Sequence, residues 1–163
     1  MSVRLRPATS GDGNAVWHIF SPILSEGTTY APDERTKESD FLRDWFGRGG
    51  EQWMAETESG VVGAYTLRPN QPGRGSHVAT ASYAVDAAAQ GLGVGQALGK
   101  HSVERAHAAG YAAIQFNFVV STNTAAVRLW KGLGFEVVAT LPGAFQHRLL
   151  GPVDAYVMWL RLR

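Results

Sequence analysis

Glycines alternate with other residues at positions 91, 93 and 95, where an apolar strand-like run gives way to a helix-like segment. Glycine allows a ligand to approach the backbone closely, and the free N–H groups at a helix N-terminus attract anions. This spacing therefore predicts a site for a phosphate or pyrophosphate group. The loop that would form it consists of Gln90, Gly91, Leu92, Gly93, Val94, Gly95 and Gln96.

The glycine spacing differs from that of two common phosphate-binding loops. A Rossmann fingerprint requires Gly-x-Gly-x-x-Gly within a βαβ unit, whereas this cluster is Gly-x-Gly-x-Gly and follows a run of strands in mid-chain. A Walker loop requires Gly-Lys-Ser or Gly-Lys-Thr, which the chain lacks. A tight strand-to-helix turn that binds no ligand remains as the structural alternative.

Asn117 interrupts an apolar strand pattern over residues 113–120. Strand alternation places Asn117 on the same face as Gln115. The opposite face carries Ile114, Phe116 and Phe118. An amide buried without a hydrogen-bond partner costs about 1–3 kcal/mol. Asn117 is therefore expected either to have a structural partner or to act on a ligand.

The elements that would position these residues follow from apolar periodicity and from glycine and proline. Strands are expected at residues 3–6, 53–57, 61–67, 77–85, 113–120, 135–141 and 153–160. Helices are expected to begin at Asp12 as a cap, at residue 36, after residue 95 and at residue 123, with loops at 26–32, 69–76 and 142–152. This order predicts an α+β fold, an α/β sandwich with a mixed, mostly antiparallel sheet of about seven strands and helices on both faces.

Composition limits the class of protein. The chain has 163 residues, a mass of 17.6 kDa and 45% hydrophobic residues, which suits a single domain over residues 1–163. The net charge of +1 argues against a nucleic-acid partner. No cysteine is present, which excludes disulfides and thiolate metal sites, and we expect no metal.

The N-terminal residues lack the apolar core of a signal peptide, and no apolar run approaches the roughly 20 residues that span a bilayer. A cytoplasmic protein without a membrane partner is therefore expected. A homodimer is the expected assembly.

Two segments resemble the signature motifs of the GNAT superfamily of acetyl-CoA-dependent N-acetyltransferases. Residues 85–95 resemble the first motif, an apolar strand end followed by Arg/Gln-x-x-Gly-x-Gly/Ala at the start of a helix. Residues 123–135 resemble the second, Asn-x-x-Ala-x-x-Leu-Tyr-x-x-x-Gly-Phe. The order of elements is also similar from end to end. The resemblance implies acetyl-CoA as co-substrate and a sheet whose two central strands splay apart at the coenzyme site.

The resemblance also implies which residues contact the coenzyme. The backbone of Tyr83, Ala84 and Val85 would lie along the pantetheine arm at the splayed strand. The backbone N–H groups of residues 91–96 would hold the pyrophosphate, next to Gln90.

Two further coenzyme contacts are implied on the helix at residues 123–133. Asn123 would hydrogen-bond the pantetheine arm, although asparagine is equally favoured as a plain helix N-cap. Lys131 or Arg128 would reach the ribose phosphate, unless each is simply a solvated helix charge.

The C-terminal third has a narrower resemblance, to acetyltransferases of small amino-acid-type amines. Residues 115–123, 141–146 and 151–155 are similar to the fungal enzymes that detoxify the proline analogue azetidine-2-carboxylate, and to their bacterial relatives. Residues 26–30 are similar to the early loop of the more distant phosphinothricin and methionine-sulfone acetyltransferases. The acceptor residues that this resemblance implies are Glu26, Thr28, Tyr30 and Phe145.

One position departs from the superfamily pattern. Trp130 replaces the tyrosine that serves many members as general acid. An indole does not give up a proton usefully, so Trp130 would line either the thioester pocket or the core. Asn117 is then the expected catalytic residue that polarises the thioester carbonyl, with Thr80 opposite it on the other central strand. Relatives that act on proline analogues have an amide at the place of Thr80, so the substrate is not expected to be identical.

No general base is evident on the strand before the glycine loop. The candidates that would act through water are His77, Glu26, Asp154 and His147, unless the amine loses its proton to bulk water. We expect direct transfer of an acetyl group from acetyl-CoA to the amine of a small molecule, an amino acid or a proline analogue, in a ternary complex. Two alternatives stay open: a protein or peptide N-terminus as acceptor, and an acyl-CoA-binding module without turnover.

Overall fold

The computed structural model describes residues 2–163, and its strands form one seven-stranded sheet. The strands are β1 (Arg4–Pro7), β2 (Glu51–Thr57), β3 (Gly60–Pro69), β4 (Val78–Val85), β5 (Ala113–Val120), β6 (Glu136–His147) and β7 (Gly151–Arg161). They lie in the order β1-β2-β3-β4-β5-β7-β6. Neighbours are antiparallel except β4 and β5, which run parallel. The predicted mixed, mostly antiparallel sheet is confirmed.

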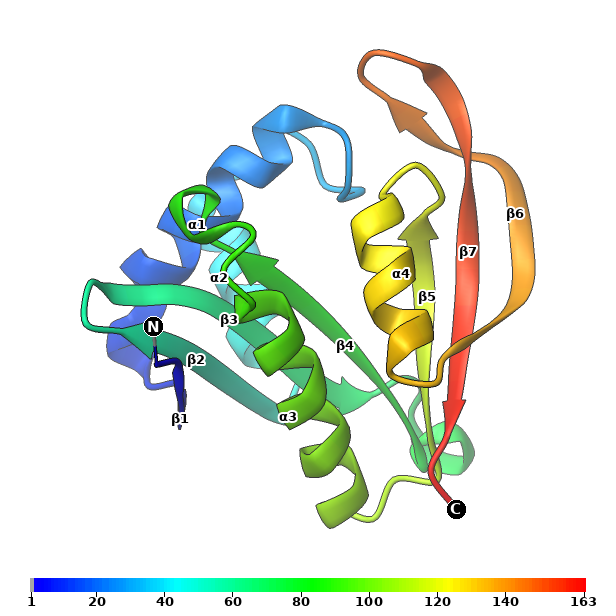
Figure 1. Cartoon of the computed structure of the whole chain (residues 1–163), viewed down its shortest axis with the longest axis horizontal. Helices are drawn as coiled ribbons and strands as arrows, with labels where there is room; N and C mark the ends of the chain where they lie inside the picture. The colour runs from blue at the N-terminus through cyan, green and yellow to red at the C-terminus, as the bar shows by residue number, and fades with distance from the viewer. Residues whose placement is uncertain (1) are drawn as a thin grey trace.

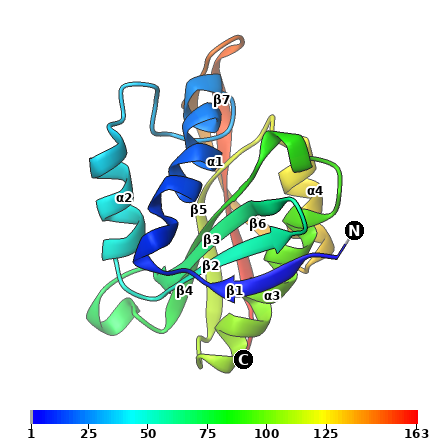
Figure 2. The ribbon, with the colours of Figure 1, turned by 90° about the vertical axis from the view of Figure 1, so that its left-hand side faces the viewer.

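Helices cover both faces of the sheet (Figure 2). They are α1 (Gly13–Glu26), α2 (Glu38–Gly47), α3 (Val94–Ala108) and α4 (Thr124–Gly132), with short 3-10 turns at Ser10–Asp12, Gly73–Gly75 and Ala87–Ala89. The helices α1 and α2 lie on one face, and α3 and α4 lie on the other. The α+β order of elements that the sequence predicts is therefore confirmed.

The parallel pair in the middle of the sheet is short (Figure 1). The strands β4 and β5 pair only at Val78 and Ala79 of β4, and beyond these residues they diverge. β5 continues along β7 instead, with an irregular register between Phe116 and Val119. The sheet is therefore splayed at its centre, as the resemblance implies.

Each face of the sheet buries its own apolar cluster. Under α1 and α2, the buried residues are Val16, Ile19, Phe20, Trp45, Met54, Ala64 and Ala84. Under α3 and α4, the largest buried residues include Tyr65, Leu67, Leu98, Ile114, Phe116, Trp130, Phe135 and Met158. These clusters fix both helix pairs against the central strands, so that the splay lies between two rigid layers.

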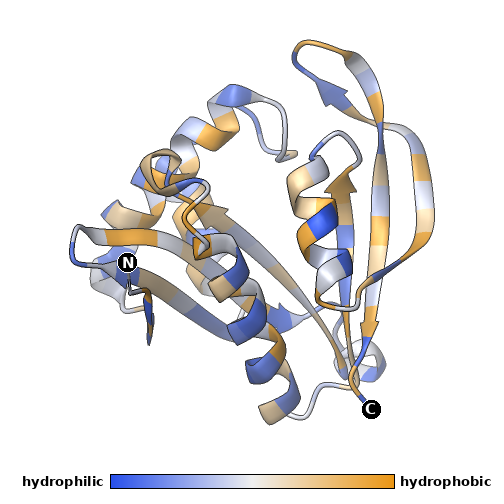
Figure 3. Cartoon of the chain, viewed as in Figure 1, coloured by the Kyte–Doolittle hydropathy of each residue, from blue (hydrophilic) through white to orange (hydrophobic). Residues whose placement is uncertain are grey.

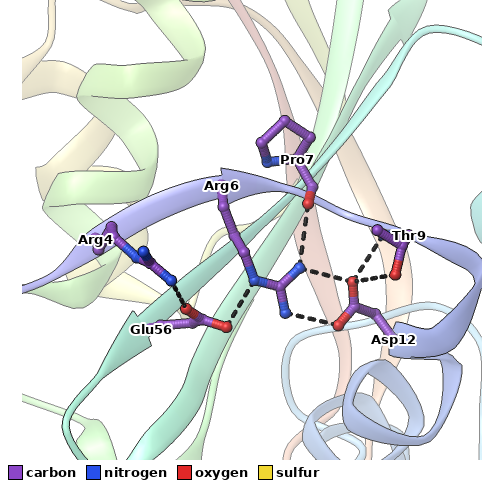
Figure 4. Close-up of polar contacts among 6 residues, drawn as sticks. All are labelled: Arg4, Arg6, Pro7, Thr9, Asp12 and Glu56. Carbon is purple, nitrogen blue, oxygen red and sulfur yellow. Dashed lines mark hydrogen bonds and ion pairs between the residues drawn. The ribbon is translucent and has the colours of Figure 1, made fainter.

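A cluster of charged side chains ties β1 to β2 and to the start of α1 (Figure 4). The Arg6 guanidinium donates to both carboxylate oxygens of Asp12 at 2.8 Å and to Glu56 at 2.6 Å. Asp12 also accepts a hydrogen bond from the Thr9 N–H at 2.7 Å, and hydrogen bonds from Arg6 lower the pKa of Asp12 to about 2. Asp12 precedes α1, as predicted, but its side chain makes no cap bond to that helix.

The segment 142–152, predicted as a loop, is mostly strand. β6 runs through Pro142 to His147 and β7 starts at Gly151, so only a tight turn separates them. Proline and glycine suggested a loop, but here they lie at a register irregularity between Leu141 and Phe145 on an edge strand, where proline removes no ladder bond. Bands of higher and lower hydropathy alternate along much of β7 (Figure 3), which is the period of a strand, while residues 157–160 form a continuous apolar run.

Candidate active site

A cleft of about 600 Å³ passes between β4 and β5 and reaches both faces of the sheet. Its walls come from α4 on one face, from α1, α2 and the loop between them on the other, and from β3, β4 and β5 in between. The lining residues are Phe20, Thr29, Tyr30, Ala31, Pro32, Thr36, Asp40, Phe41, Asp44, Trp45, Arg48, Thr66, Arg68, Thr80, Ala81, Ser82, Tyr83, Phe116, Asn117, Phe118, Val119, Val120, Asn123, Ala126 and Trp130.

The glycine loop leads into α3, next to the end of β4. Gly91 and Gly93 have φ angles of +77° and +83°, in the left-handed region that only glycine adopts readily. Within residues 2–163, the N–H groups of Gly91, Leu92 and Gly93 donate no hydrogen bond. No atom lies within 4 Å of a Cβ built on either glycine. Glycine is therefore required here by backbone conformation, while the free N–H groups and the open space suit an anion.

Side chains brace this loop against β4. Asp86 accepts a hydrogen bond from the Ala88 N–H at 2.8 Å, and the Gln90 amide donates to the Val85 carbonyl at 3.2 Å. Gln90 thus holds the end of β4 beside the loop, and the assignment of Gln90 and Val85 to the coenzyme stays a prediction.

Tyr30 occupies the free edge of β4. Its hydroxyl accepts a hydrogen bond from the Tyr83 N–H at 2.9 Å and donates to the Tyr83 carbonyl at 2.5 Å. Burial raises the pKa of Tyr30 to about 12. The Tyr30 hydroxyl therefore uses the backbone groups of Tyr83 that were assigned to the pantetheine arm. The coenzyme roles of Tyr83, Ala84 and Val85 stay predictions.

Asn123 and Trp130 each combine a structural role with a place in the cleft wall, and the predicted contact between Asn123 and the pantetheine arm stays a prediction. Asn123 lies at the N-cap, where its side chain accepts a hydrogen bond from the Ala126 N–H at 3.3 Å, and it also lines the cleft. Trp130 is 7% exposed, packs on Tyr83 with ring centroids 4.7 Å apart, and lines the same cleft. Trp130 therefore belongs to both the core and the cleft wall.

Lys131 does not line the cleft. It borders a separate surface pocket of about 400 Å³ together with Ser121, Thr124, Arg128 and Tyr156. This pocket lies on the side of α4 toward β7, so neither Lys131 nor Arg128 gains support as a coenzyme contact.

Thr80 and Asn117 line the cleft from opposite strands, as predicted. Thr80 is 5% exposed. Asn117 is exposed; its amide donates to Asn70 Oδ1 at 2.7 Å and accepts from Gln115 Nε2 at 2.9 Å. The predicted shared face of Gln115 and Asn117 agrees with the hydrogen bond between their side chains. The alternation breaks between Asn117 and Val119, because the register between β5 and β7 shifts there.

Of the predicted acceptor residues, only Tyr30 lines the cleft. Glu26 is exposed at the end of α1, and Thr28 lies in the loop that follows, outside the lining. Phe145 is buried and packs against the cleft residue Phe118, with ring centroids 6.2 Å apart. Phe145 therefore packs behind the cleft wall without lining the cleft itself.

The acceptor side contains residues that sequence reasoning missed. Asp40, Asp44 and Arg48 of the α2 segment line the cleft, as do Thr66 and Arg68 of β3. A signal existed for the first three, because positions four apart share one helix face. It was overlooked because charges on a helix are usually solvated.

The predicted general-base candidates lie away from the cleft. Among the lining residues, the carboxylates are Asp40 and Asp44. Asp154 accepts a hydrogen bond from the Gly143 N–H at 2.9 Å, and His147 Nδ1 accepts from the Leu149 N–H at 3.1 Å. Both side chains therefore stabilise the β6–β7 hairpin.

The described residues form neither a metal site nor a membrane-spanning helix. No group of three or more His, Asp or Glu side chains that could hold a metal ion occurs in the described part of the chain. Within residues 2–163, no helix is both long and apolar enough to cross a membrane.

The sequence matches a known family over most of its length. Residues 14–135 match the Acetyltransferase (GNAT) family. Over 142 residues, 85% of this chain, the sequence is 30% identical to N-acetyltransferase aca1 of Schizosaccharomyces pombe. The chain spans 59% of the length of that protein.

Solved structures share the fold. A GCN5-related N-acetyltransferase from Kribbella flavida has a TM-score of 0.93 and 41% sequence identity over 98% of both chains. The yncA structure from Salmonella typhimurium, solved with its cofactor acetyl-CoA, has a TM-score of 0.88 and 23% identity over 100% of this chain and 95% of that chain. The family match and this shared fold show that the chain belongs to the GNAT family of acetyl-CoA-dependent N-acetyltransferases.

Proposed function

We propose that the protein transfers an acetyl group from acetyl-CoA to the amine of a small molecule, an amino acid or a proline analogue. The observation that carries the proposal is the cleft at the β4–β5 splay, because it connects two different environments through the sheet. The N–H groups of residues 91–93 are free on the α3 side, and hydroxyl and charged side chains line the α2 side.

The residues on the α3 side fit acetyl-CoA. The free N–H groups at the start of α3 suit its pyrophosphate. The cleft leaves room for an extended arm beside β4, past the Tyr83 backbone groups that Tyr30 uses. When bound, acetyl-CoA supplies an activated acetyl group as a thioester. Asn123, at the mouth of the cleft, retains its amide N–H₂ as a donor because only its oxygen caps α4.

We assign polarisation of the thioester carbonyl to Asn117, with the Thr80 hydroxyl opposite it in the cleft. One N–H of the Asn117 amide is bound to Asn70, which orients the side chain and leaves the second N–H free to donate. The Thr80 hydroxyl faces the cleft from the opposite strand and makes no hydrogen bond within residues 2–163. A fixed donor that faces developing negative charge stabilises it without reorganisation.

We also propose that proton removal from the amine occurs on the α2 side. Asp40 and Asp44 line the cleft there and are exposed, so water can carry the proton to either carboxylate. Trp130 lacks an acidic proton, so the departing thiolate would take its proton from solvent. Catalysis would therefore rest mainly on positioning.

Thiol release tests the proposed function. The purified protein is mixed with acetyl-CoA and a panel of amino acids, proline analogues, polyamines and peptides, and free thiol is measured. The absence of cysteine from the chain keeps the background low. Release with an amino acid or a proline analogue supports the proposal. Release only with peptides would replace it by a peptide acetyltransferase, and tight coenzyme binding without any release would replace it by a binding module.

We further propose that residues 1–163 act as one catalytic domain and that the protein works in the cytoplasm. We also propose that two copies of the chain associate. The edge strand β6 supports association, because Val137 and Val138 are exposed there, at 36% and 56%. Light scattering on purified protein would give the mass in solution, and a monomer at all concentrations would contradict this part.

A further inference from the structure

Arg68 is a cation in the cleft that makes no direct contact with a carboxylate within residues 2–163. It lies near the end of β3 and is partly buried. Within residues 2–163, its guanidinium makes neither an ion pair nor a hydrogen bond. The pKa of Arg68 is lowered, first by burial and then by the nearby positive charge of Arg48. Both effects disfavour the cation, and the charge of Asp44 opposes them only in part. An anion bound directly to the guanidinium would relieve them further.

The other charged residues on this wall already have partners. Asp44 pairs with Arg48 at 3.1 Å, and Asp40 pairs with Arg43 at 3.1 Å. Asp44 is therefore paired directly with Arg48 and acts on Arg68 only from a distance. Among the charged side chains that line the cleft, Arg68 is left to bind something from outside.

The backbone holds Arg68 in a fixed position. Arg68 pairs with Thr80 across the β3–β4 ladder. On its other side, Gly50 has a φ of +74°, and a Cβ there would lie only 2.7 Å from Arg68 Cα. The segment between α2 and β2 therefore packs directly against the Arg68 backbone. Strand pairing and this packing hold the Arg68 backbone in place, as a ligand-binding residue requires.

Two hydroxyls surround Arg68 on the same face of the sheet. Thr66 and Thr80 are each 5% exposed, line the cleft, and share this face by strand alternation and register. A guanidinium with neighbouring hydroxyl donors is suited to a planar carboxylate, which it binds through two parallel hydrogen bonds. The coenzyme phosphates do not need Arg68, because α3 with its free N–H groups lies on the opposite face.

We infer that Arg68 binds the carboxylate of the acceptor, so that the substrate is an amine carrying a carboxylate, such as an α-amino or α-imino acid. The inference rests on the proposed function. Arg68 and Thr80 are cross-strand partners that line the same cleft from the same face of the sheet, so a small acceptor bound to the guanidinium can also reach Thr80. An amine on the adjacent carbon then faces the splay.

A pair of matched probes tests the inference: azetidine-2-carboxylate and its carboxamide, which keeps the amine but lacks the negative charge. Binding to the protein is measured by calorimetry without acetyl-CoA, and KM and kcat are measured with it. The variants are Arg68→Gln, Arg68→Lys and, as a control, Arg74→Gln, which removes an exposed charge in the turn Gly73–Gly75 outside the cleft. Melting curves verify that each variant folds.

We expect the wild-type protein to prefer the carboxylate. Arg68→Gln should weaken carboxylate binding and raise its KM by about 10- to 100-fold, the usual loss for a charge-assisted contact. Binding of the carboxamide to Arg68→Gln should change less than about twofold. The loss of carboxylate binding in Arg68→Lys should be smaller than in Arg68→Gln, and Arg74→Gln should bind both probes as the wild type does.

Three results would overturn the inference: no preference in the wild-type protein, an equal loss for both probes in Arg68→Gln, or no binding of either probe. Failure of the proposed function would look different. In that case, the calorimetric preference for the carboxylate would persist while no acceptor released thiol.

Discussion

Arg6 and Arg68 lie in the same sheet, but their surroundings are opposite. Arg6 on β1 is saturated, because Asp12 and Glu56 accept hydrogen bonds from three of its N–H groups (Figure 4). Arg68 on β3 has no acceptor within residues 2–163 and faces the cleft. Both side chains are partly buried. Burial therefore does not explain why Arg6 has partners and Arg68 has none within the described residues. Their positions in the fold explain it.

The contrast between Arg6 and Arg68 distinguishes two kinds of charged side chain. One kind is paired within the protein and stabilises the fold, and the other is unpaired and can bind a ligand. At the β1 edge, the opposite charges lie within 2.8 Å of each other, and the cost of removing them from water is offset. Around the splay, several polar groups lack a hydrogen-bond or ion-pair partner within residues 2–163: the N–H groups of residues 91–93, the Thr80 hydroxyl and Arg68. Thr80 and Arg68 line one cleft, and the glycine loop follows the β4 strand that forms part of its wall, which indicates binding rather than stability.

The largest expected effect comes from placing a charge at the coenzyme end of the cleft. Gly93→Glu should lower acetyl-CoA affinity by about 10³-fold or more, because a carboxylate next to the pyrophosphate site repels it. Any side chain at a φ of +83° also strains the backbone. Gly93→Ala is therefore the matched control: calorimetry should show near-normal affinity, and both variants should melt earlier. Equal affinity in the two variants would refute the anion site.

The next effect concerns the Asn117 amide, which is only partly satisfied within the protein. Asn117→Ala should lower kcat by about 10²–10³, the range for one lost donor to an oxyanion. The control is Gln115→Ala, which removes the neighbouring amide that does not line the cleft. Its kcat should stay within about threefold if Asn70 is enough to orient Asn117.

Steady-state kinetics distinguish the roles of Asn117. A higher KM with unchanged kcat would mean that Asn117 binds the acceptor equally in the ground and transition states. A lower melting temperature with full activity of the folded protein would make Asn117 structural.

At the β1 edge, the expected effect is on stability instead of catalysis. Asp12→Asn should lower the free energy of unfolding by about 1–3 kcal/mol near neutral pH. Because the folded-state pKa of Asp12 is lowered, its contribution is complete above the unfolded value and is lost as the pH falls from 3.8 to about 2. Urea unfolding at several pH values checks this. A difference between wild type and variant that persists unchanged at pH 2 would contradict it, as would a lower kcat.

The smallest expected effect is at Trp130, where core and cleft meet. Trp130→Phe keeps an aromatic ring against Tyr83 and Phe116 and removes the indole N–H. Because the N–H is not an acid, kcat should fall by less than about tenfold, or roughly 1.4 kcal/mol. A larger fall in a folded protein with normal coenzyme affinity would mean that the N–H takes part in the reaction.

Much of the fold could be predicted from the sequence, because it depends on local patterns. The stripe of Val16, Ile19 and Phe20 is buried under the sheet, and Gly110 follows α3 with a φ of +89°. Residues 142–152 were mispredicted, since proline and glycine favour a loop unless the strand lies at an edge. Edge position depends on the order of strands and not on the local sequence.

The site was predictable at the coenzyme end and much less so at the acceptor end. The glycine loop is contiguous, so its spacing alone indicates anion binding. The α2 side of the cleft combines Asp44, Arg48 and Arg68, which are brought together only when α2 packs over β3 and β4. The bulge after Phe116 likewise depends on pairing with β7, and it determines where Asn117 lies.

The most direct test compares Arg6→Gln with Arg68→Gln, using urea unfolding and thiol-release kinetics on the same preparations. Arg6→Gln should lower the free energy of unfolding by about 1–3 kcal/mol and leave kcat/KM of the folded protein unchanged. Arg68→Gln should leave stability within about 0.5 kcal/mol of wild type and lower kcat/KM for a carboxylate-bearing amine by at least about tenfold. If Arg68→Gln costs as much stability as Arg6→Gln and spares kcat/KM, then Arg68 serves the fold, and the division between structural and available charges is wrong.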